Sequence, residues 1–205
     1  LTLRNAVSAV ESAVGADHPD TLTSWGGLAG AYESAGRLDK AIPVLQKVLV
    51  DRARVLGPNH PHTLASCNNL ALAYQRAGRL SKAISLYKKV VADRVRVLGP
   101  EHSHTLSSRS NLAYTYQRAG RLNKAILLYE KVLADCVRIL GPGHPDTLSS
   151  RNNLAGAYEL AGRIGDAIPL FEGVLADRVR ILGPDHPDTL SSRNNLAGAY
   201  QQAGR

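Results

Sequence analysis

Histidine is the residue type most suggestive of chemistry in this sequence of 205 residues. Seven histidines are present, and His60 with His62, like His102 with His104, have the close spacing found among metal ligands. One histidine, however, recurs every 42 residues, in most cases directly before a proline. Proline at the first position of a helix, with an acidic residue such as Asp146 in the first turn, suits the unpaired N–H groups of a helix start. We therefore expect helix capping rather than a metal site, and no cofactor, at the recurring positions His18, His60, His102, His144 and His186.

The cysteines, serines and acidic residues show no catalytic arrangement. Cys67 and Cys136 lie at different offsets within the 42-residue period, so free buried thiols are expected rather than a paired ligand set. The sequence has no G-x-S-x-G motif, no H-E-x-x-H motif and no P-loop. The chain is therefore predicted not to be an enzyme.

Aspartate recurs three residues before arginine in every full period. This spacing places the two side chains side by side on one face of a helix, where each pair adds about 0.2–0.5 kcal/mol. We expect solvated surface pairs at Asp51 and Arg54, Asp93 and Arg96, Asp135 and Arg138, and Asp177 and Arg180.

The 42-residue period predicts a pair of helices in each unit. Residues 61–77 carry apolar side chains at the spacing of an amphipathic helix, and Gly78 supplies the left-handed residue that ends one. A second helix is predicted over residues 82–98, ending at Gly99-Pro100. Candidate N-cap residues for this second helix in successive units are Asp39, Ser81 and Asn123.

The composition agrees with a globular helical chain and limits its partners. Apolar residues make up 44% and aromatic residues 5%, with no methionine, as in closely packed helices. The net charge of +8 favours acidic partners. No signal peptide or long apolar run is present, and two cysteines are too few for a disulfide framework, so a reducing cytoplasm is expected and a membrane partner is not. Because the chain starts at Leu1 and has no methionine, we expect a fragment of a longer protein or a trimmed chain.

The first unit carries Trp25, Leu28, Ala29 and Tyr32, followed by Ala41 and Leu45, and so resembles the tetratricopeptide repeat. The period of 42 residues is similar to that of kinesin light chain repeats. It also resembles the repeat arrays of actinobacterial NB-ARC (STAND-type) proteins. The resemblance implies an all-α, right-handed α-solenoid of antiparallel helix pairs.

The constant register predicts a single array over residues 1–205, without a linker. It consists of a partial second helix in 1–16, full repeats at 17–58, 59–100, 101–142 and 143–184, and the first helix of a fifth repeat in 185–205.

The resemblance implies a non-enzymatic protein-interaction module that binds an extended peptide or a partner helix in a concave groove, within a larger signalling or scaffold protein. Asparagine side chains along this groove both donate and accept hydrogen bonds, so they suit the backbone of a peptide, and the arginines suit carboxylates. The predicted peptide-binding residues are Asn68, Asn69, Leu72, Gln75, Arg76, Asn111, Tyr114, Gln117, Arg118, Asn152, Asn153, Asn194 and Asn195.

Two points about this face stay open in the sequence. The first asparagine of each pair, such as Asn152, has the alternative of a hydrogen bond between adjacent helices that fixes their stacking. The position of Trp25 is arginine in the last three repeats, and its direction, toward the groove or the outer surface, is undecided for Arg109, Arg151 and Arg193.

Two other functions compete with peptide binding. The first and last helices lack partners, so head-to-tail self-association is one alternative, unless neighbouring repeats of a longer protein cover both ends. Nucleic-acid binding through the positive charge is the other, but the tyrosines fall at packing positions rather than on a stacking surface, which disfavours it.

Overall fold

A computed structural model describes residues 3–204, and within this part all regular structure is helical. This confirms the predicted fold class, and none of the described helices is long and apolar enough to cross a membrane. Residues 1, 2 and 205 of the predicted array lie outside the described part. The helices are α1 (Leu3–Val14), α2 (Pro19–Ser34), α3 (Leu38–Leu56), α4 (Pro61–Arg76), α5 (Leu80–Leu98), α6 (Ser103–Arg118), α7 (Leu122–Leu140), α8 (Pro145–Leu160), α9 (Ile164–Leu182) and α10 (Pro187–Gln202).

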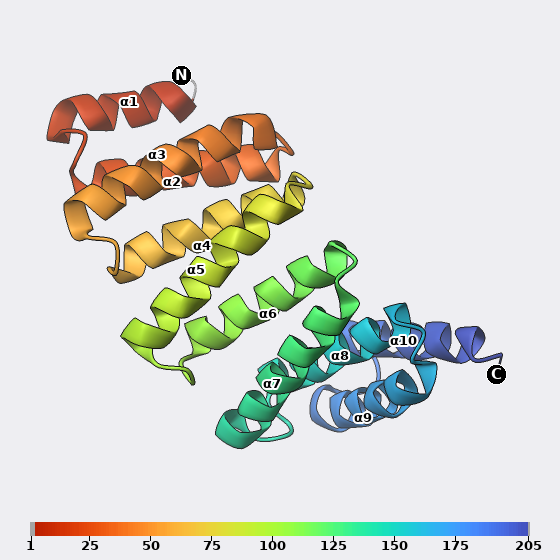
Figure 1. Ribbon diagram of the computed structural model, residues 1–205. Helices are drawn as coiled ribbons and strands as arrows, with labels where there is room; N and C mark the ends of the chain where they lie inside the picture. The colour runs from red at the N-terminus through yellow and green to blue at the C-terminus, as the bar shows by residue number, and fades with distance from the viewer. Residues whose placement is uncertain (1–2, 205) are drawn as a thin grey trace. The chain divides into compact units, whose positions relative to one another are not determined.

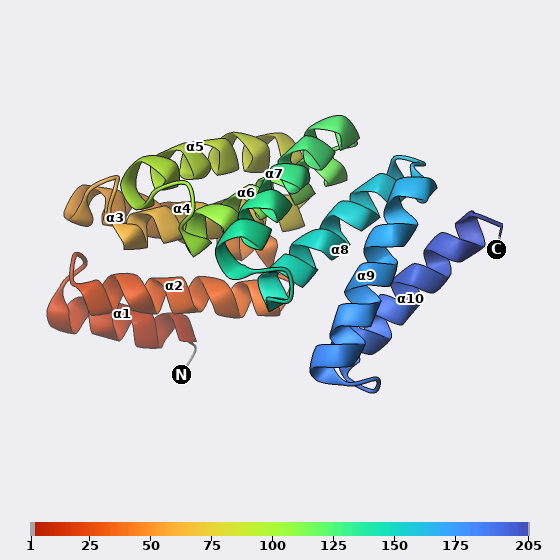
Figure 2. The ribbon, with the colours of Figure 1, turned by 90° about the horizontal axis from the view of Figure 1, so that it is seen from below.

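The helices form two compact units, Leu1–Pro100 and Glu101–Arg205. Within each unit every helix packs against the next one along the chain, as Figures 1 and 2 show for α1 to α5 and for α6 to α10. From α2 onward, first helices of 16 residues alternate with second helices of 19 residues. Each repeat is thus an antiparallel helix pair.

The recurring histidine is the N-cap of every first helix, as the sequence predicted. The Nδ1 atom of His144 accepts a hydrogen bond from the backbone N–H of Asp146 at 3.1 Å, and the other four histidines make the same bond. One of the unpaired N–H groups at the helix start is thereby satisfied. The period of the histidines follows from this structural role.

The threonine of the same motif joins consecutive repeats. Thr147 is fully buried, and its hydroxyl donates to the carbonyl oxygen of Gly141 at 2.8 Å. Gly141 ends the preceding helix with φ of 87°, a backbone conformation that favours glycine. The hydroxyl therefore gives a close partner to a carbonyl group that has none within α7, and the same bond recurs at Thr21, Thr63 and Thr189.

The predicted caps of the second helices are wrong. α5 begins at Leu80, one residue before Ser81, and the N-cap residue is Arg79, whose side chain makes no capping hydrogen bond. The preceding turn explains this shift: Gly78 has φ of 71°, and the N–H of Arg79 donates back to the carbonyl oxygen of Tyr74. This bond ends α4 only a few residues before Leu80, so α5 begins directly after the turn. Asp39 and Asn123 likewise lie inside their helices rather than at the N-cap.

Small and large side chains alternate in the core. Ala29, Ala71, Ala113 and Ala155 have no exposed surface, which lets the helices approach closely. One position in the second helix holds the largest buried side chains, Tyr87, Tyr129 and Phe171 in successive repeats. These residues fill the space between the helices of each pair.

Candidate functional site

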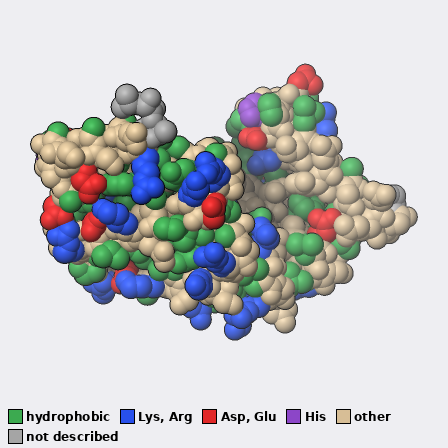
Figure 3. Space-filling model, turned by 90° about the horizontal axis from the view of Figure 1, so that it is seen from above, with side chains coloured by type: hydrophobic (Ala, Val, Ile, Leu, Met, Phe, Trp, Pro, Cys, Tyr) green, Lys and Arg blue, Asp and Glu red, His purple; other side chains and the backbone are tan. Residues whose placement is uncertain are grey.

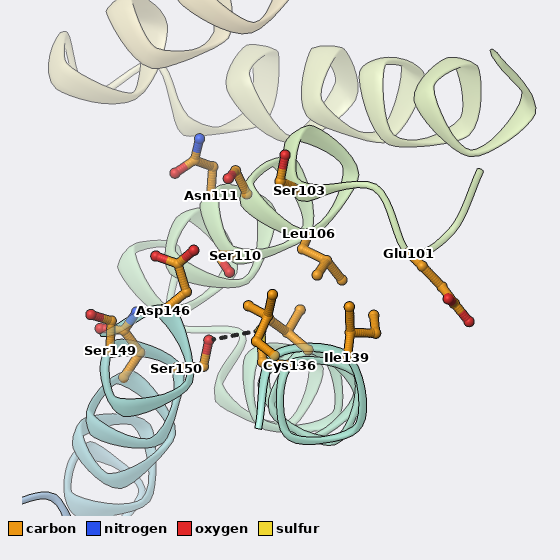
Figure 4. Close-up of a pocket in the computed structure, with 14 residues that line it drawn as sticks. Glu101, Ser103, Leu106, Ser110, Asn111, Cys136, Ile139, Asp146, Ser149 and Ser150 are labelled. Atoms are coloured by element: carbon orange, nitrogen blue, oxygen red, sulfur yellow. Dashed lines mark hydrogen bonds between the residues drawn. The ribbon is translucent and has the colours of Figure 1, made fainter. Parts of the chain in front are cut away.

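A pocket of about 380 Å³ opens between α6, α7 and α8 of the second unit. We call it the α6–α8 pocket (Figure 4). Side chains from α6 and α8 line two sides of the pocket, and side chains from the second half of α7 complete the lining. Its apolar lining consists of Leu106, Val132, Cys136, Ile139 and Leu140.

Polar groups without positive charge form the rest of the α6–α8 pocket. Two amides, Asn111 and Asn153, occupy the same position in successive repeats, and five serines also line the pocket. Glu101 and Asp146 bring carboxylates to the rim, and neither lysine nor arginine lines the pocket within the described part of the chain. The pocket therefore favours neutral or cationic groups.

The two carboxylates differ in the positive groups that lie beside them. Glu101 forms an ion pair with Arg138 at 2.8 Å, and this contact raises the pKa of Arg138. Asp146 lies near the imidazole of His144, at 3.9 Å, but this contact is an ion pair only when the histidine is protonated. Asp146 therefore carries the negative charge of the pocket that is least compensated.

Cys136 lies at the back of the pocket and is not set up as a nucleophile. Its Sγ atom faces the hydroxyl of Ser150 at 3.6 Å (Figure 4). Burial raises the pKa of the thiol, against a smaller lowering by the contact with Ser150. The thiol is therefore neutral at physiological pH, while nucleophilic chemistry needs the thiolate. Both Cys136 and Cys67 are free and buried, as expected.

The structure brings two of the predicted peptide-binding residues into the pocket and distributes the others along their helices. Asn111 and Asn153 line the α6–α8 pocket. Farther along α6, Gln117 is half-buried, and the exposed Arg118 lies over the ring of Tyr114, which is 43% exposed.

In the first unit, the predicted residues on α4 differ in exposure. Asn69 and Arg76 are exposed, and Asn68 and Leu72 are half-buried. Gln75 is buried, with 4% of its surface exposed, so little of this amide is presented to solvent.

Two of the predicted asparagines bind each other. The Nδ2 atom of Asn195 on α10 donates to the Oδ1 atom of Asn152 on α8 at 3.0 Å. A second side-chain hydrogen bond joins the same helices farther along, where the Nε2 atom of Gln202 donates to the Oε1 atom of Glu159 at 2.7 Å. For Asn152, the stacking alternative is therefore what the structure shows, while Asn194 is exposed.

The direction of the repeated arginines is settled for two of the three. Arg109 and Arg151 turn toward the second helix of their own repeat, where their Nη1 atoms lie 3.0 Å from Asp135 and Asp177. The same aspartates also form the predicted helix-surface pairs with Arg138 and Arg180. Arg193 is exposed.

No metal site is found in the described part of the chain, because no three His, Cys, Asp or Glu side chains come together there. The imidazoles of His60 and His62 stack with ring centres 5.3 Å apart, and the Nδ1 atom of His60 is already the acceptor of the helix cap.

Cys136 helps to determine the shape of the pocket, and the sequence analysis did not predict this role. Its position is arginine in the other full repeats, at Arg52, Arg94 and Arg178. Aligning the repeats at this position is the signal that identifies it.

Comparisons with known proteins agree with the geometry. Family models described as tetratricopeptide repeat match residues 3–61 and the overlapping ranges 36–94, 68–136, 105–177 and 146–205. A crystal structure of nearly identical TPR-like repeats, from a Podosopora anserina protein described as a kinesin light chain, is 37% identical. The match covers 91% of this chain and 89% of that chain, with a TM-score of 0.80.

Two further structures have the same fold. A single-residue variant of the Podosopora anserina protein is 36% identical, with a TM-score of 0.81 over 91% of this chain and 88% of that chain. BtubC (BKLC) from P. vanneervenii is 22% identical, with a TM-score of 0.80 over 100% of this chain and 85% of that one. A comparison with curated proteins gives no match.

Proposed function

The chain belongs to the tetratricopeptide repeat family, and from this premise we propose that it is a non-enzymatic module that holds an extended peptide or a partner helix. The α6–α8 pocket is the observation that carries this proposal. It places two equivalent amides, Asn111 and Asn153, on one accessible surface. Each amide offers a donor and an acceptor, so the pair suits the backbone of a bound peptide.

The proposed partner is acidic overall. The net charge of the chain is +8, and lysine and arginine side chains are prominent on the face shown in Figure 3. Exposed Arg76 and Arg118 offer charge to carboxylates. We further propose a cytoplasmic protein, in keeping with two free cysteines, and a larger signalling or scaffold protein as its context, in keeping with the NB-ARC resemblance.

We predict that replacing Asn111 and Asn153 together by alanine weakens peptide binding at least about tenfold. A loss of 1.4 kcal/mol produces such a change, and two lost amide contacts supply it. The measurement is binding to an array of random immobilised peptides, followed by titration of the best-bound sequence in solution.

Asn123→Ala is the matched control, because this exposed asparagine on α7 lies outside the pocket. It should leave binding unchanged. Thermal unfolding of all variants separates a lost contact from a lost fold. If no peptide of any composition binds the unmodified chain, the proposed function is wrong.

Self-association is the second candidate function, and the exposure of Leu190 favours it. The equivalent residues Leu22, Leu64, Leu106 and Leu148 are 2–5% exposed, whereas Leu190 on α10 is 43% exposed. An apolar side chain that is buried in every other repeat is available here for a second copy of the chain.

We predict that Leu190→Ser reduces self-association, because burying this leucine contributes about 1.5–3 kcal/mol. Sedimentation velocity over a wide concentration range measures the effect. Leu160→Ser is the control, because it removes another exposed leucine side chain at a different place on the surface. A mass that stays monomeric at all concentrations in the unmodified chain excludes this second function.

A further inference from the structure

One position near the end of the second helix distinguishes the repeat that forms the α6–α8 pocket. It is arginine at 52, 94 and 178, and cysteine at 136. The contacts of this arginine are seen at Arg52 in the first unit and at Arg178 in the second unit. There it reaches from the second helix of one repeat to the first helix of the next.

In both units this arginine donates to the serine at the same repeat position of the following first helix. The Nη1 atom of Arg52 donates to the hydroxyl of Ser66 at 2.8 Å. The Nη1 atom of Arg178 donates to the hydroxyl of Ser192 at 2.9 Å and to the carbonyl oxygen of Asp188 at 3.0 Å. In the α6–α8 pocket the equivalent serine is Ser150, which faces only the short side chain of Cys136 at 3.6 Å.

The first unit shows how much space this arginine occupies. A cavity beside Arg52 is lined by residues at the same repeat positions as those of the α6–α8 pocket, with Leu22 in place of Leu106 and Leu56 in place of Leu140. Its volume is about 80 Å³, against about 380 Å³ where Cys136 replaces the arginine. The α6–α8 pocket is therefore the space that an arginine side chain fills in the first unit, and it is open because residue 136 is cysteine.

The acceptors for a guanidinium group remain in place. Ser150 keeps its hydroxyl, and Asp146 stands at the position of Asp188 with both its carbonyl oxygen and a carboxylate. In the first unit the residue at that position is His62, which carries no carboxylate. A cation in the α6–α8 pocket thus meets more negative charge than Arg52 does.

The apolar lining suits the rest of an arginine side chain. Val132, Ile139 and Leu140 form a surface on which three methylene groups can pack while the guanidinium group reaches the polar rim. Arg138, which pairs with Glu101 of the pocket lining, is also engaged with Asp135. Within the described residues no arginine lines this pocket, so a bound peptide can supply the guanidinium group.

We propose that the α6–α8 pocket binds an arginine side chain of the partner peptide. This inference rests on the proposed function and specifies one residue of its ligand. The planar guanidinium group donates in a fork that matches a hydroxyl, a carbonyl oxygen and a carboxylate together. Lysine offers one compact ammonium group and matches this set less well. The rest of the partner remains acidic.

The probe for this proposal is the capped pentapeptide Ac-Ala-Ala-Arg-Ala-Ala-NH₂. Versions with citrulline or lysine in place of arginine, and the free amino acid arginine, are compared with it by NMR titration of the backbone amides. We expect saturable shifts at Ser149, Ser150 and Asn153. The arginine peptide should bind at least about tenfold more tightly than the neutral citrulline peptide, which is 1.4 kcal/mol. The arginine peptide should also bind more tightly than free arginine, because only the peptide has a backbone that can hydrogen-bond to the side-chain amides of Asn111 and Asn153.

Cys136→Arg is the decisive variant, since it fills the pocket with the side chain that the other repeats carry. It should abolish binding of the arginine peptide while the melting temperature stays the same or rises. Because the substitution restores a contact already present at Arg52 and Arg178, a lost fold does not account for the loss of binding. Arg178→Cys is the reciprocal variant, and it should create a second binding site, with new shifts at Ser192.

The outcomes separate this inference from the proposed function. Equal affinities for the arginine and citrulline peptides, or unchanged binding to the Cys136→Arg variant, overturn the arginine site. If peptides from the random array still bind in that case, the proposed function stands without it. If neither the pentapeptide nor any array peptide binds, both are overturned.

Discussion

Replacing Phe171 by alanine is expected to lower the free energy of unfolding by about 3–5 kcal/mol, the largest effect of any single substitution considered for this chain. Phe171 is 2% exposed on α9, in a cluster with Ala155 on α8, Ala199 on α10, and Ala167 and Ile168 of its own helix. Removing the ring leaves a cavity that rigid alanine neighbours cannot fill. Chemical denaturation followed by circular dichroism measures the loss.

The location of the loss is also predicted. In a repeat array each repeat contacts only its neighbours, so stability is lost locally. Hydrogen exchange of Phe171→Ala should therefore speed up in α8, α9 and α10 and change less in α2 to α4. Phe171→Leu is the control, because Leu45 occupies this position in the first repeat and is 4% exposed there. A loss below about 1 kcal/mol for Phe171→Ala contradicts the packing of α9 between its neighbours.

The elements of this fold could be predicted because their signals are local. The histidine before the first helix and the glycine after it act on the nearest turn of backbone, and the 42-residue period repeats the signal. The same local view failed at Ser81. A cap was expected there from residue type, but the N–H of Arg79 is used by the preceding helix, and that depends on the geometry of the whole turn.

The candidate site could be predicted only in part, because its shape depends on contacts between repeats. The repeat positions of Asn111 and Asn153 predict that the two amides share a surface, and both line the α6–α8 pocket. The direction of Arg151 was not predictable, since a long side chain reaches several surfaces and the position of Asp177 selects among them. For Asn152 the sequence leaves peptide binding and helix stacking open, and the hydrogen bond from Asn195 uses this amide within the protein.

The α6–α8 pocket shows why net charge alone describes the partner poorly. The chain carries a charge of +8, which favours an acidic partner, but Glu101 and Asp146 are the charged residues that line the pocket. The long-range field steers a ligand toward the protein, whereas the groups in contact decide which side chain fits. An acidic peptide with one arginine satisfies both, and raising the salt concentration should weaken its acidic contacts most.

Tyr87 makes the stability of the chain depend on pH in the alkaline range. Its side chain is fully buried, and within the described residues its hydroxyl has no hydrogen-bond partner. Burial raises the pKa of Tyr87 to about 12, with smaller and opposing effects of Arg76 and Glu33. The ordinary pKa of tyrosine in an unfolded chain is about 10. The folded protein therefore holds this proton more tightly than the unfolded chain does.

The sign of the pH dependence follows from this difference. Below pH 10 both states are protonated and Tyr87 contributes nothing to the pH dependence. Between pH 10 and about 12 the unfolded chain releases its proton while the folded protein keeps it, so the free energy of unfolding falls as the pH rises. A difference of two pKa units is worth about 3 kcal/mol, and this is the expected loss from Tyr87 across the interval.

Tyr87→Phe isolates this contribution from the other groups that titrate at high pH. Phenylalanine already occupies the same position at Phe171, and removing an unpaired buried hydroxyl should leave stability at neutral pH equal or higher. The difference in unfolding free energy between the two proteins should stay constant from pH 7 to 9. It should then grow in favour of Tyr87→Phe up to pH 12, as measured by denaturant titrations at each pH. Parallel curves for the two proteins across this whole range contradict the prediction, because they mean that the Tyr87 hydroxyl loses its proton equally easily in the folded and unfolded states.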